Sequence, residues 1–264
     1  MPKFSANLAY LWNDLPICDA ISAATKAGFA AVEFQTPYDT PAHDVATALK
    51  HHGARAMTLN TRIGDVGKDE FGLAALPGRE ETARAFICDA FEYADVIDAL
   101  GVHVIAGRTA EPTAIDVFVE NLKYASDLAN RSDKIVLIEP LNRFDVPGYF
   151  LPNLDSCLKV LKKVDRRNVK LMFDCYHVAK SGDDVEKRIA EVFENIGHIQ
   201  FASPPNRTKP DEGNLDFGRI FKRIDQLGWR LPIGAEYKTN GPTEQSLSWM
   251  TAYKNDLINV RIGL

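Results

Sequence analysis

The chain has 264 residues, of which 45% are hydrophobic and 25% are charged, and its formal net charge at pH 7 is −5. This composition excludes an intrinsically disordered chain, and no apolar run approaches the roughly 20 residues that span a bilayer. The mild acidity and the lack of a dense basic patch argue against a nucleic-acid partner.

Short apolar runs alternate with longer amphipathic segments along the whole chain. The runs predict eight strands, at Lys3–Leu8, Ala30–Phe34, Arg55–Asn60, Val102–Ala106, Ile135–Glu139, Lys170–Asp174, His198–Phe201 and Pro232–Glu236. The segments between them predict eight helices, at Leu15–Ala27, Pro41–His52, Arg79–Leu100, Ala114–Arg131, Leu154–Lys163, Asp184–Asn195, Phe217–Leu227 and Thr243–Leu257. Gly28, Gly53 and Gly101 follow the first three helices, as expected of residues that end a helix.

Strict alternation of strand and helix predicts a parallel sheet with right-handed crossovers. Eight such units in about 260 residues favour a closed barrel over an open sheet. The alternative is an open doubly wound sheet, which usually has a glycine-rich phosphate loop after its first strand, whereas residues 6–12 (ANLAYLW) contain no glycine. We therefore predict a single (β/α)₈ TIM-barrel domain over residues 1–264. Two long connections, Thr61–Gly78 and Ser203–Asp216, are expected to be binding or lid loops at its active face.

Polar groups close four consecutive predicted strands. Apolar runs lead into Glu139, Asp174 and Glu236, and His198-Ile199 leads into Gln200, with spacings of 35, 26 and 36 residues. Each spacing is one strand–helix unit, so a barrel would set the four side chains next to one another. A single glutamate at a strand end is usually a loop cap or an ion-paired group, but four groups in this register favour a site. Gln200 is the weakest of them, because a satisfied core glutamine is common.

Three carboxylates and an amide in one pocket need a cation, since mutual repulsion would otherwise raise their pKa values and keep them protonated. Hard oxygen ligands favour Mg²⁺ or Mn²⁺ over zinc, which prefers histidine and cysteine. We therefore expect Glu139, Asp174, Gln200 and Glu236 to hold a divalent metal. His198 shares a strand face with Gln200 and is expected to pack lower in the barrel.

The four cysteines (Cys18, Cys88, Cys157 and Cys175) are far apart and form no CxxC pair. They are expected to be reduced thiols. The first ten residues lack the charged and apolar regions of a signal peptide, so we expect a cytoplasmic protein without a membrane partner.

Several segments resemble the hydroxypyruvate isomerase family of xylose-isomerase-like barrels. They are residues 138–142 (IEPLN), 173–177 (FDCYH), 197–200 (GHIQ), 234–238 (GAEYK), 4–8 (FSANL), 32–34 (VEF), 37–39 (PYD), 77–81 (PGREE) and 144–148 (FDVPG). The resemblance covers nearly the whole chain. It implies an enzyme that converts a small hydroxy-carbonyl acid into its isomer, as in hydroxypyruvate to tartronate semialdehyde, and, by analogy with other barrel isomerases, a homo-oligomer.

The same resemblance implies roles for individual residues. It places the catalytic acid–base pair at Glu139 and Glu236 and the metal ligands at Glu139, Asp174, Gln200 and Glu236. It matches His177 and Arg207 to substrate-contacting positions, and Lys238 and Asn60 are expected as further substrate contacts apart from the resemblance. Arg207 and Lys238 would suit a substrate carboxylate. Alternatively, His177 makes only a structural hydrogen bond, and Arg207 and Lys238 are ordinary surface charges.

The chain departs from the family pattern in its loops. A pocket histidine is replaced by Leu59, and two loop glutamates are replaced by Lys209 and Asn214. These changes keep open a 2-oxo-tetronate isomerase, a ketose 3-epimerase or an inosose dehydratase on the same core. A zinc-dependent abasic-site endonuclease is disfavoured by the six histidines and the acidic charge, and a non-enzymatic binding protein by the four polar strand ends.

Overall fold

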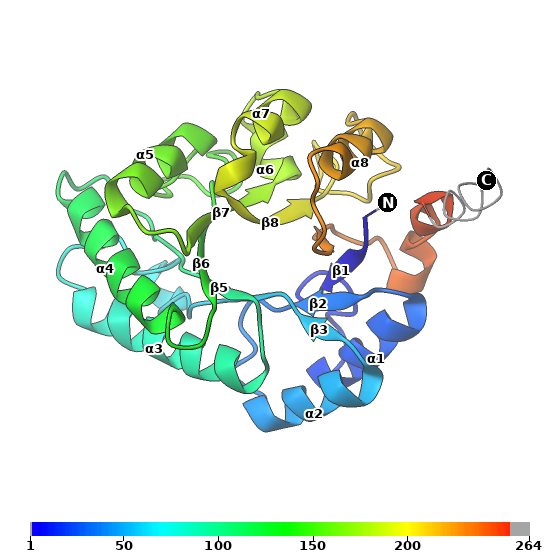
Figure 1. Cartoon of the computed structure of the whole chain (residues 1–264), viewed down its shortest axis with the longest axis horizontal. Coiled ribbons are helices and arrows are strands. Elements are labelled where there is room, and N and C mark those ends of the chain that lie inside the picture. The colour runs from blue at the N-terminus through cyan, green and yellow to red at the C-terminus, as the bar shows by residue number, and fades with distance from the viewer. Residues whose placement is uncertain (1, 254–264) are drawn as a thin grey trace.

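The structure is a computed structural model that describes residues 2–253, and these residues form parallel strands that alternate with helices (Figure 1). The strands are β1 (Phe4–Asn7), β2 (Ala31–Glu33), β3 (Arg55–Ala56), β4 (Thr58–Asn60), β5 (Gly101–His103), β6 (Ile135–Ile138), β7 (Val169–Asp174), β8 (Ile196–Phe201) and β9 (Ile233–Ala235). The α-helices are α1 (Ile17–Ala27), α2 (Ala42–His52), α3 (Glu80–Val96), α4 (Ala114–Ala129), α5 (Leu154–Val164), α6 (Cys175–Lys180), α7 (Val185–Glu191) and α8 (Phe217–Gln226).

The sheet closes into a ring. Its order is β3-β2-β1-β9-β8-β7-β6-β5-β4, and β3 and β4 are the two halves of one predicted strand, interrupted at Met57. Hydrogen bonds join this interrupted strand to the β2 segment on both sides of the break: Met57 N donates to Val32 O at 2.8 Å, and Phe34 N, just after β2, donates to Thr58 O of β4 at 2.8 Å. The predicted (β/α)₈ barrel is therefore confirmed, and the open sheet is excluded.

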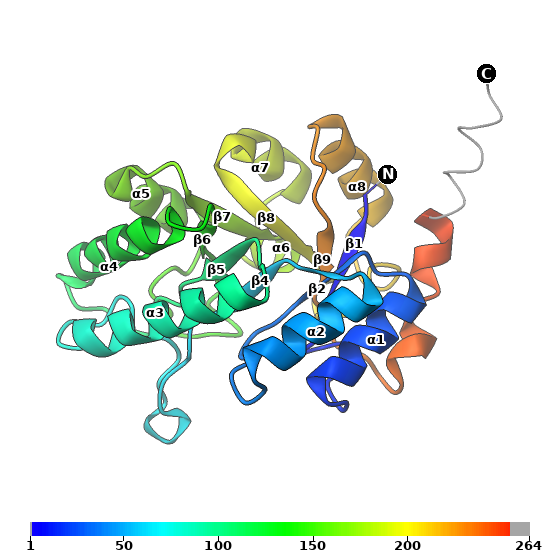
Figure 2. The same ribbon diagram turned by 60° about the horizontal axis from the view of Figure 1, so that its bottom comes forward.

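The helices surround the ring, and the short strands match the predicted ones within a few residues (Figure 2). Gly28 and Gly53 end α1 and α2 in the left-handed conformation, with φ of 97° and 65°. The prediction that Gly101 ends the third helix was wrong. That helix already stops at Val96, Asp98 takes the left-handed turn with φ 50°, and Gly101 begins β5.

The predicted set of helices needs three further corrections. The short helix α6 follows β7 at once and was not predicted; the Asp174 side chain begins it by accepting a hydrogen bond from Tyr176 N at 2.9 Å. The predicted helix Thr243–Leu257 is instead a 3₁₀ turn at Thr243–Ser246 followed by helical residues from 249 to 253, and its remaining residues lie outside the described part. The predicted helix Asp184–Asn195 divides into α7 and a 3₁₀ turn, Phe193–Asn195.

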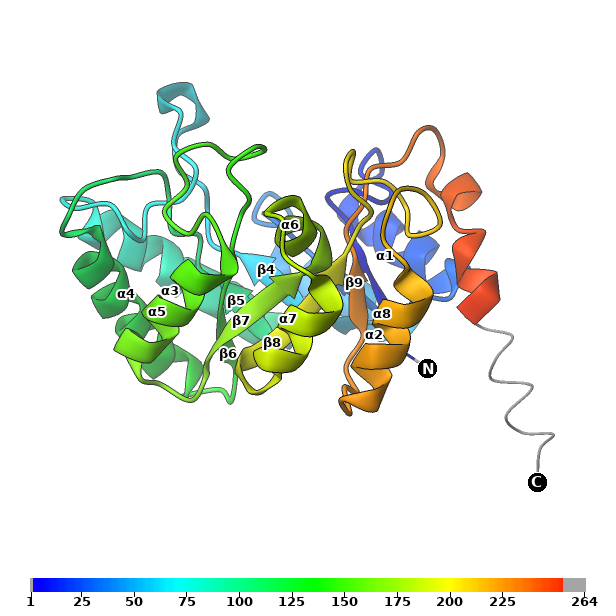
Figure 3. The same ribbon diagram turned by 90° about the horizontal axis from the view of Figure 1, so that it is seen from above.

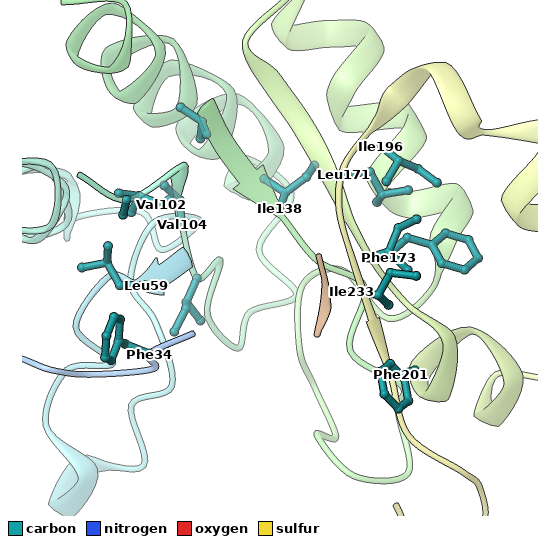
Figure 4. Close-up of a cluster of buried hydrophobic side chains, with 14 of the residues drawn as sticks. Phe34, Leu59, Val102, Val104, Ile138, Leu171, Phe173, Ile196, Phe201 and Ile233 are labelled. Carbon is teal, nitrogen blue, oxygen red and sulfur yellow. The ribbon is translucent and has the colours of Figure 1, made fainter. Parts of the chain in front are cut away.

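Apolar side chains from successive strands pack against the helices in one continuous core (Figure 4). Because residues alternate along a strand, the other side of each strand faces the barrel interior. That interior carries buried polar groups, among them Ser5, Glu33, His198 and Gln200. An apolar outer layer thus encloses a polar centre.

The loops that follow the strands gather at one end of the barrel (Figure 3). This is the end at which TIM barrels place their sites. Between residues 2 and 253, none of the helices combines the length and hydrophobicity needed to cross a membrane. The four cysteines are unpaired, as expected.

Candidate active site

A cavity of about 460 Å³ opens at the carboxyl ends of the strands. Its volume lies in the range of small-molecule sites, roughly 300–1,000 Å³. The predicted site residues that line it are Asn60, Glu139, His177, Gln200, Arg207, Glu236 and Lys238. Asp174, the remaining predicted residue, is fully buried and does not line the cavity, although it contacts Arg207. The structure therefore brings the predicted residues together at one place.

Glu236, directly after β9, is held by several donors. Its Oε2 accepts a hydrogen bond from Arg207 Nη2 at 2.7 Å, and its Oε1 accepts from Asn7 Nδ2 at 2.9 Å and from Gln35 Nε2 at 3.1 Å. Burial raises the pKa of Glu236 to about 7, although the Arg207 charge opposes that rise. A carboxyl group with such a pKa is suited to proton transfer near neutral pH.

Arg207 is the central cation of the site. Its Nη2 also donates to Asp174 Oδ2 at 3.2 Å, and its guanidinium carbon lies 4.8 Å from the ring centre of Tyr10 and 5.0 Å from that of Tyr176. Burial raises the pKa of Asp174, and Arg207 opposes this shift as well. Arg207 is therefore a buried counter-ion of Asp174 and Glu236, and not a surface charge.

Glu139, directly after β6, is the least satisfied of the acidic groups. Its Oε1 is buried and has no hydrogen-bond partner among residues 2–253. Burial, and after it the charges of Glu236 and Asp174, raise the pKa of Glu139 well above its usual value. A buried acceptor without a donor is costly, so this oxygen is available to a ligand or cation.

His103 lies beside Glu139 and was not predicted as a site residue. Its Nδ1 is 3.2 Å from Asn60 Oδ1 and 3.6 Å from Glu139 Oε2. Burial lowers the pKa of His103 to about 3, so its contact with Glu139 is not an ion pair at neutral pH. The imidazole is a neutral group in the cavity wall.

Neighbouring donors determine the tautomer of His177. Its Nδ1 accepts from Asn142 N at 3.1 Å and lies 2.8 Å from Asn142 Nδ2. The Asn142 amide is itself oriented, because its Oδ1 accepts from Phe144 N and Asp145 N. Burial lowers the pKa of His177 well below its usual value, and Arg207 adds to the shift. Because Asn142 donates to Nδ1, we assign the single ring proton to Nε2, which is 3.1 Å from Arg207 Nη1 and 3.7 Å from Asp174 Oδ2.

Gln200, on β8, lies above a buried polar network. Its Nε2 donates to Glu33 Oε2 at 2.8 Å, and His198 Nε2 lies 2.9 Å from Glu33 Oε1. Burial raises the pKa of Glu33, but the His198 charge and the hydrogen bonds from His198, Ser5 and Gln200 outweigh it and lower that pKa overall. His198 thus packs below the cavity, as expected, while Oε1 of Gln200 has no partner among the described residues.

The residues around the cavity fit a hard cation. Oε1 of Glu139 and Oε1 of Gln200 are both buried acceptors that have no partner within residues 2–253, and a metal ion would satisfy them. Glu139, Asp174 and His177 each place one potential ligand atom within 4.8 Å of the others. A divalent cation can therefore be held here by groups of this part of the chain.

Sequence reasoning missed Glu33, Asn7 and His103. Glu33 and Asn7 could have been found, since each is a polar residue one position before the end of a predicted strand, and each ends the observed strand. His103 lies inside a predicted strand and gave no such signal. Of the departures from the family pattern, Leu59 packs in the core and does not line the cavity (Figure 4), and Lys209 pairs with acidic residues of its own loop.

Comparison with known proteins identifies relatives over nearly the whole chain. A family model described as a xylose isomerase-like TIM barrel matches residues 21–253. A 2-oxo-tetronate isomerase from Cupriavidus necator is 39% identical over 259 residues, which is 96% of this chain and 99% of the relative. The hydroxypyruvate isomerase of Escherichia coli K12 is 31% identical, covering 96% and 100%. A crystal structure named AP endonuclease, family 2, from Brucella melitensis has a TM-score of 0.93 at 36% identity, covering 96% and 99%.

Proposed function

The chain belongs to the xylose isomerase-like TIM-barrel family, and from this premise we propose that it is an isomerase of a small hydroxy-carbonyl acid, of the hydroxypyruvate or 2-oxo-tetronate type named for its relatives. The observation that carries the proposal is the pair Glu139 and Glu236. Both carboxyl groups line one cavity, and burial raises the pKa of each.

The reaction moves a carbonyl group between adjacent carbons. One glutamate takes the proton from the hydroxyl-bearing carbon, and the electron pair of that C–H bond forms the carbon–carbon double bond of a cis-enediolate. The other glutamate returns a proton to the former carbonyl carbon, while a hydroxyl proton passes between the two oxygens. Glu139 and Glu236 exchange roles when the reaction runs backwards. Positioned acid–base groups are worth about 10²–10⁴-fold in rate.

His177 and Arg207 provide a place for the substrate oxygen on which negative charge develops. His177 Nε2 carries its proton, and Arg207 Nη1 is also a donor, yet these two nitrogens lie 3.1 Å apart. In this tautomer the two donors face each other, and the nearby acceptor Asp174 Oδ2 lies 3.7 Å from Nε2, beyond hydrogen-bond distance. A substrate oxygen that accepts from both would satisfy them and would be stabilised as it becomes an oxyanion.

For the metal we propose the ligands Glu139, Asp174, Gln200 and Glu236, with Mg²⁺ or Mn²⁺ as the ion, because all four offer oxygen. His177 is a poorer ligand, since its Nδ1 is occupied by Asn142 and its Nε2 carries the proton. A divalent cation held there would supply Lewis-acid stabilisation of the developing negative charge.

We assign the substrate carboxylate to Lys238, because Arg207 already pairs with two carboxylates of the protein. The Lys238 side chain is exposed and lines the cavity, and its ammonium has no partner among residues 2–253. Asn60, whose Oδ1 contacts His103, lines the same cavity and is proposed to contact a substrate hydroxyl.

Lys238→Met is therefore expected to raise KM for the acid substrate about tenfold, which corresponds to one partly solvated charge-assisted hydrogen bond, with little change in kcat. Steady-state kinetics would measure both constants, and Lys238→Arg, which keeps the charge, is the matched control. An unchanged KM in Lys238→Met would place the substrate carboxylate elsewhere.

A substrate panel tests the proposed function. Hydroxypyruvate, 2-oxo-tetronate, fructose, psicose and an inosose would be assayed after EDTA treatment and again after Mn²⁺ or Mg²⁺ is added. We expect turnover of a 2-oxo acid that EDTA abolishes and Mn²⁺ restores. Turnover of a ketose or inosose alone would favour an epimerase or a dehydratase, and no turnover of any compound with either metal would refute the isomerase.

A further inference from the structure

Glu33 is a fully buried acid that the proposed reaction does not use. It ends β2 inside the barrel and does not line the cavity, and its neighbours are polar groups of β1 and β8. Since β2, β1, β9 and β8 are consecutive in the sheet, Glu33 reaches across the barrel interior to Gln200. A buried carboxylate in this place needs an explanation, because burying a charge is costly.

Every polar contact of the Glu33 carboxylate is made to a donor. Oε1 accepts from Ser5 Oγ and lies 2.9 Å from His198 Nε2, and Oε2 accepts from Gln200 Nε2 at 2.8 Å. An ionised carboxylate can only accept hydrogen bonds. The Gln200 amide must therefore turn its NH₂ group toward Glu33. Its oxygen then points away from Glu33.

Gly234 of β9 provides the space in which Glu33 and Gln200 meet. A Cβ atom added to Gly234 of β9 would lie 2.3 Å from Glu33 Oε1 and 2.8 Å from Gln200 Cγ. Real Cβ contacts are not this short, so the absence of a side chain at Gly234 is what lets Glu33 and Gln200 meet. The glycine of β9 thus allows the close approach of the two side chains, and the hydrogen bond from Gln200 Nε2 to Glu33 Oε2 sets the amide orientation.

We propose that Glu33 is a positioning residue that orients the Gln200 amide so that its oxygen, and not its NH₂ group, is presented to a divalent cation. The inference rests on the proposed function, in which Gln200 is one of the four metal ligands. The supporting observation is Oε1 of Gln200, which is buried and has no partner among the described residues. If the side-chain amide of Gln200 were flipped so that its oxygen and NH₂ group changed places, it would point N–H donors at the cation.

Glu33→Gln is expected to weaken Mn²⁺ binding to the whole chain about 10- to 100-fold, the usual cost of losing a group that orients a metal ligand. A second amide can offer Gln200 either an oxygen or an NH₂ group, so it no longer selects one orientation. Isothermal titration with MnCl₂ in the absence of substrate would measure the dissociation constant, and a circular dichroism melt would confirm that each variant is folded.

Two further variants separate orientation from charge, since Glu33→Gln also removes a negative charge near the cation. Glu33→Asp keeps the charge but withdraws the carboxylate from Gln200, and it too is expected to weaken Mn²⁺ binding at least about fivefold. In a Gln200→Ala background, where no amide remains to be oriented, Glu33→Gln is expected to change the dissociation constant less than about twofold.

The outcomes are distinguishable. If the wild-type chain does not bind Mn²⁺, the proposed metal site fails, and this inference fails with it. If the wild type binds Mn²⁺ but Glu33→Asp binds as tightly, or if Glu33→Gln weakens binding equally with and without Gln200, then Glu33 acts only through its charge and the positioning role is overturned. Should Glu33→Gln not fold, Glu33→Asp alone decides between these results.

Discussion

Replacing Glu139 with glutamine is expected to lower kcat about 10²–10⁴-fold while leaving the melting temperature unchanged or raising it. The rate falls because an amide neither accepts nor returns the substrate proton. Stability is retained because Oε1 of Glu139 has no hydrogen-bond partner in the described chain and its carboxyl faces the charges of Glu236 and Asp174. Removing one ionisable group from such a cluster removes its repulsion with the neighbouring carboxylates and the free-energy cost of burying its charge.

Steady-state kinetics with the substrate found in the panel would measure kcat for Glu139→Gln, and a thermal melt of the metal-free protein would measure stability. Glu92→Gln, an exposed glutamate on the outer face of α3, is the matched control and should change neither quantity. A rate within about threefold of the wild type would rule out Glu139 as an acid–base group.

Arg207→Met is expected to destabilise the metal-free protein by about 3–5 kcal/mol, the usual cost of removing one partner of a buried ion pair. Arg207 donates to both Glu236 and Asp174, and both are buried. Without the guanidinium these carboxyl groups either stay charged without a cation or take up protons. Urea denaturation in the presence of EDTA would measure the free energy of unfolding. A loss below about 1 kcal/mol, the range of an exposed pair, would contradict the central role of Arg207.

The loss in Arg207→Met should depend on pH in a defined direction. The pKa of Glu236 is raised in the folded protein to about 7 from 4.5. Its contribution to stability is therefore fully present below pH 4.5 and is lost as the pH rises through about 7. Removing Arg207 would raise this pKa further, so the loss continues to higher pH in the variant. The difference in unfolding free energy between wild type and variant is expected to be larger at about pH 8.5 than at about pH 6.

The alternation of apolar runs and amphipathic segments was sufficient to predict the barrel. Each strand is short and buried, so its apolar run is a local signal. The one-unit spacing from Glu139 to Asp174, Gln200 and Glu236 then placed these residues at the same end of the ring. Element ends were less certain, because α3 stops at Val96 through an aspartate turn and not at the glycine of β5.

The pairing of these groups was decided only by the tertiary structure. Asn7 meets Glu236 across 229 residues, and His198 meets Glu33 across 165. No local pattern records such contacts, since they arise when the ring closes and brings β1 beside β9 and β2 near β8. Arg207 is a further case, because its loop conformation, with φ 60°, turns an ordinary loop arginine into the buried cation between two carboxylates. The sequence thus determined which chemical groups reach the site, whereas closure of the barrel determined which of them neutralise and orient one another.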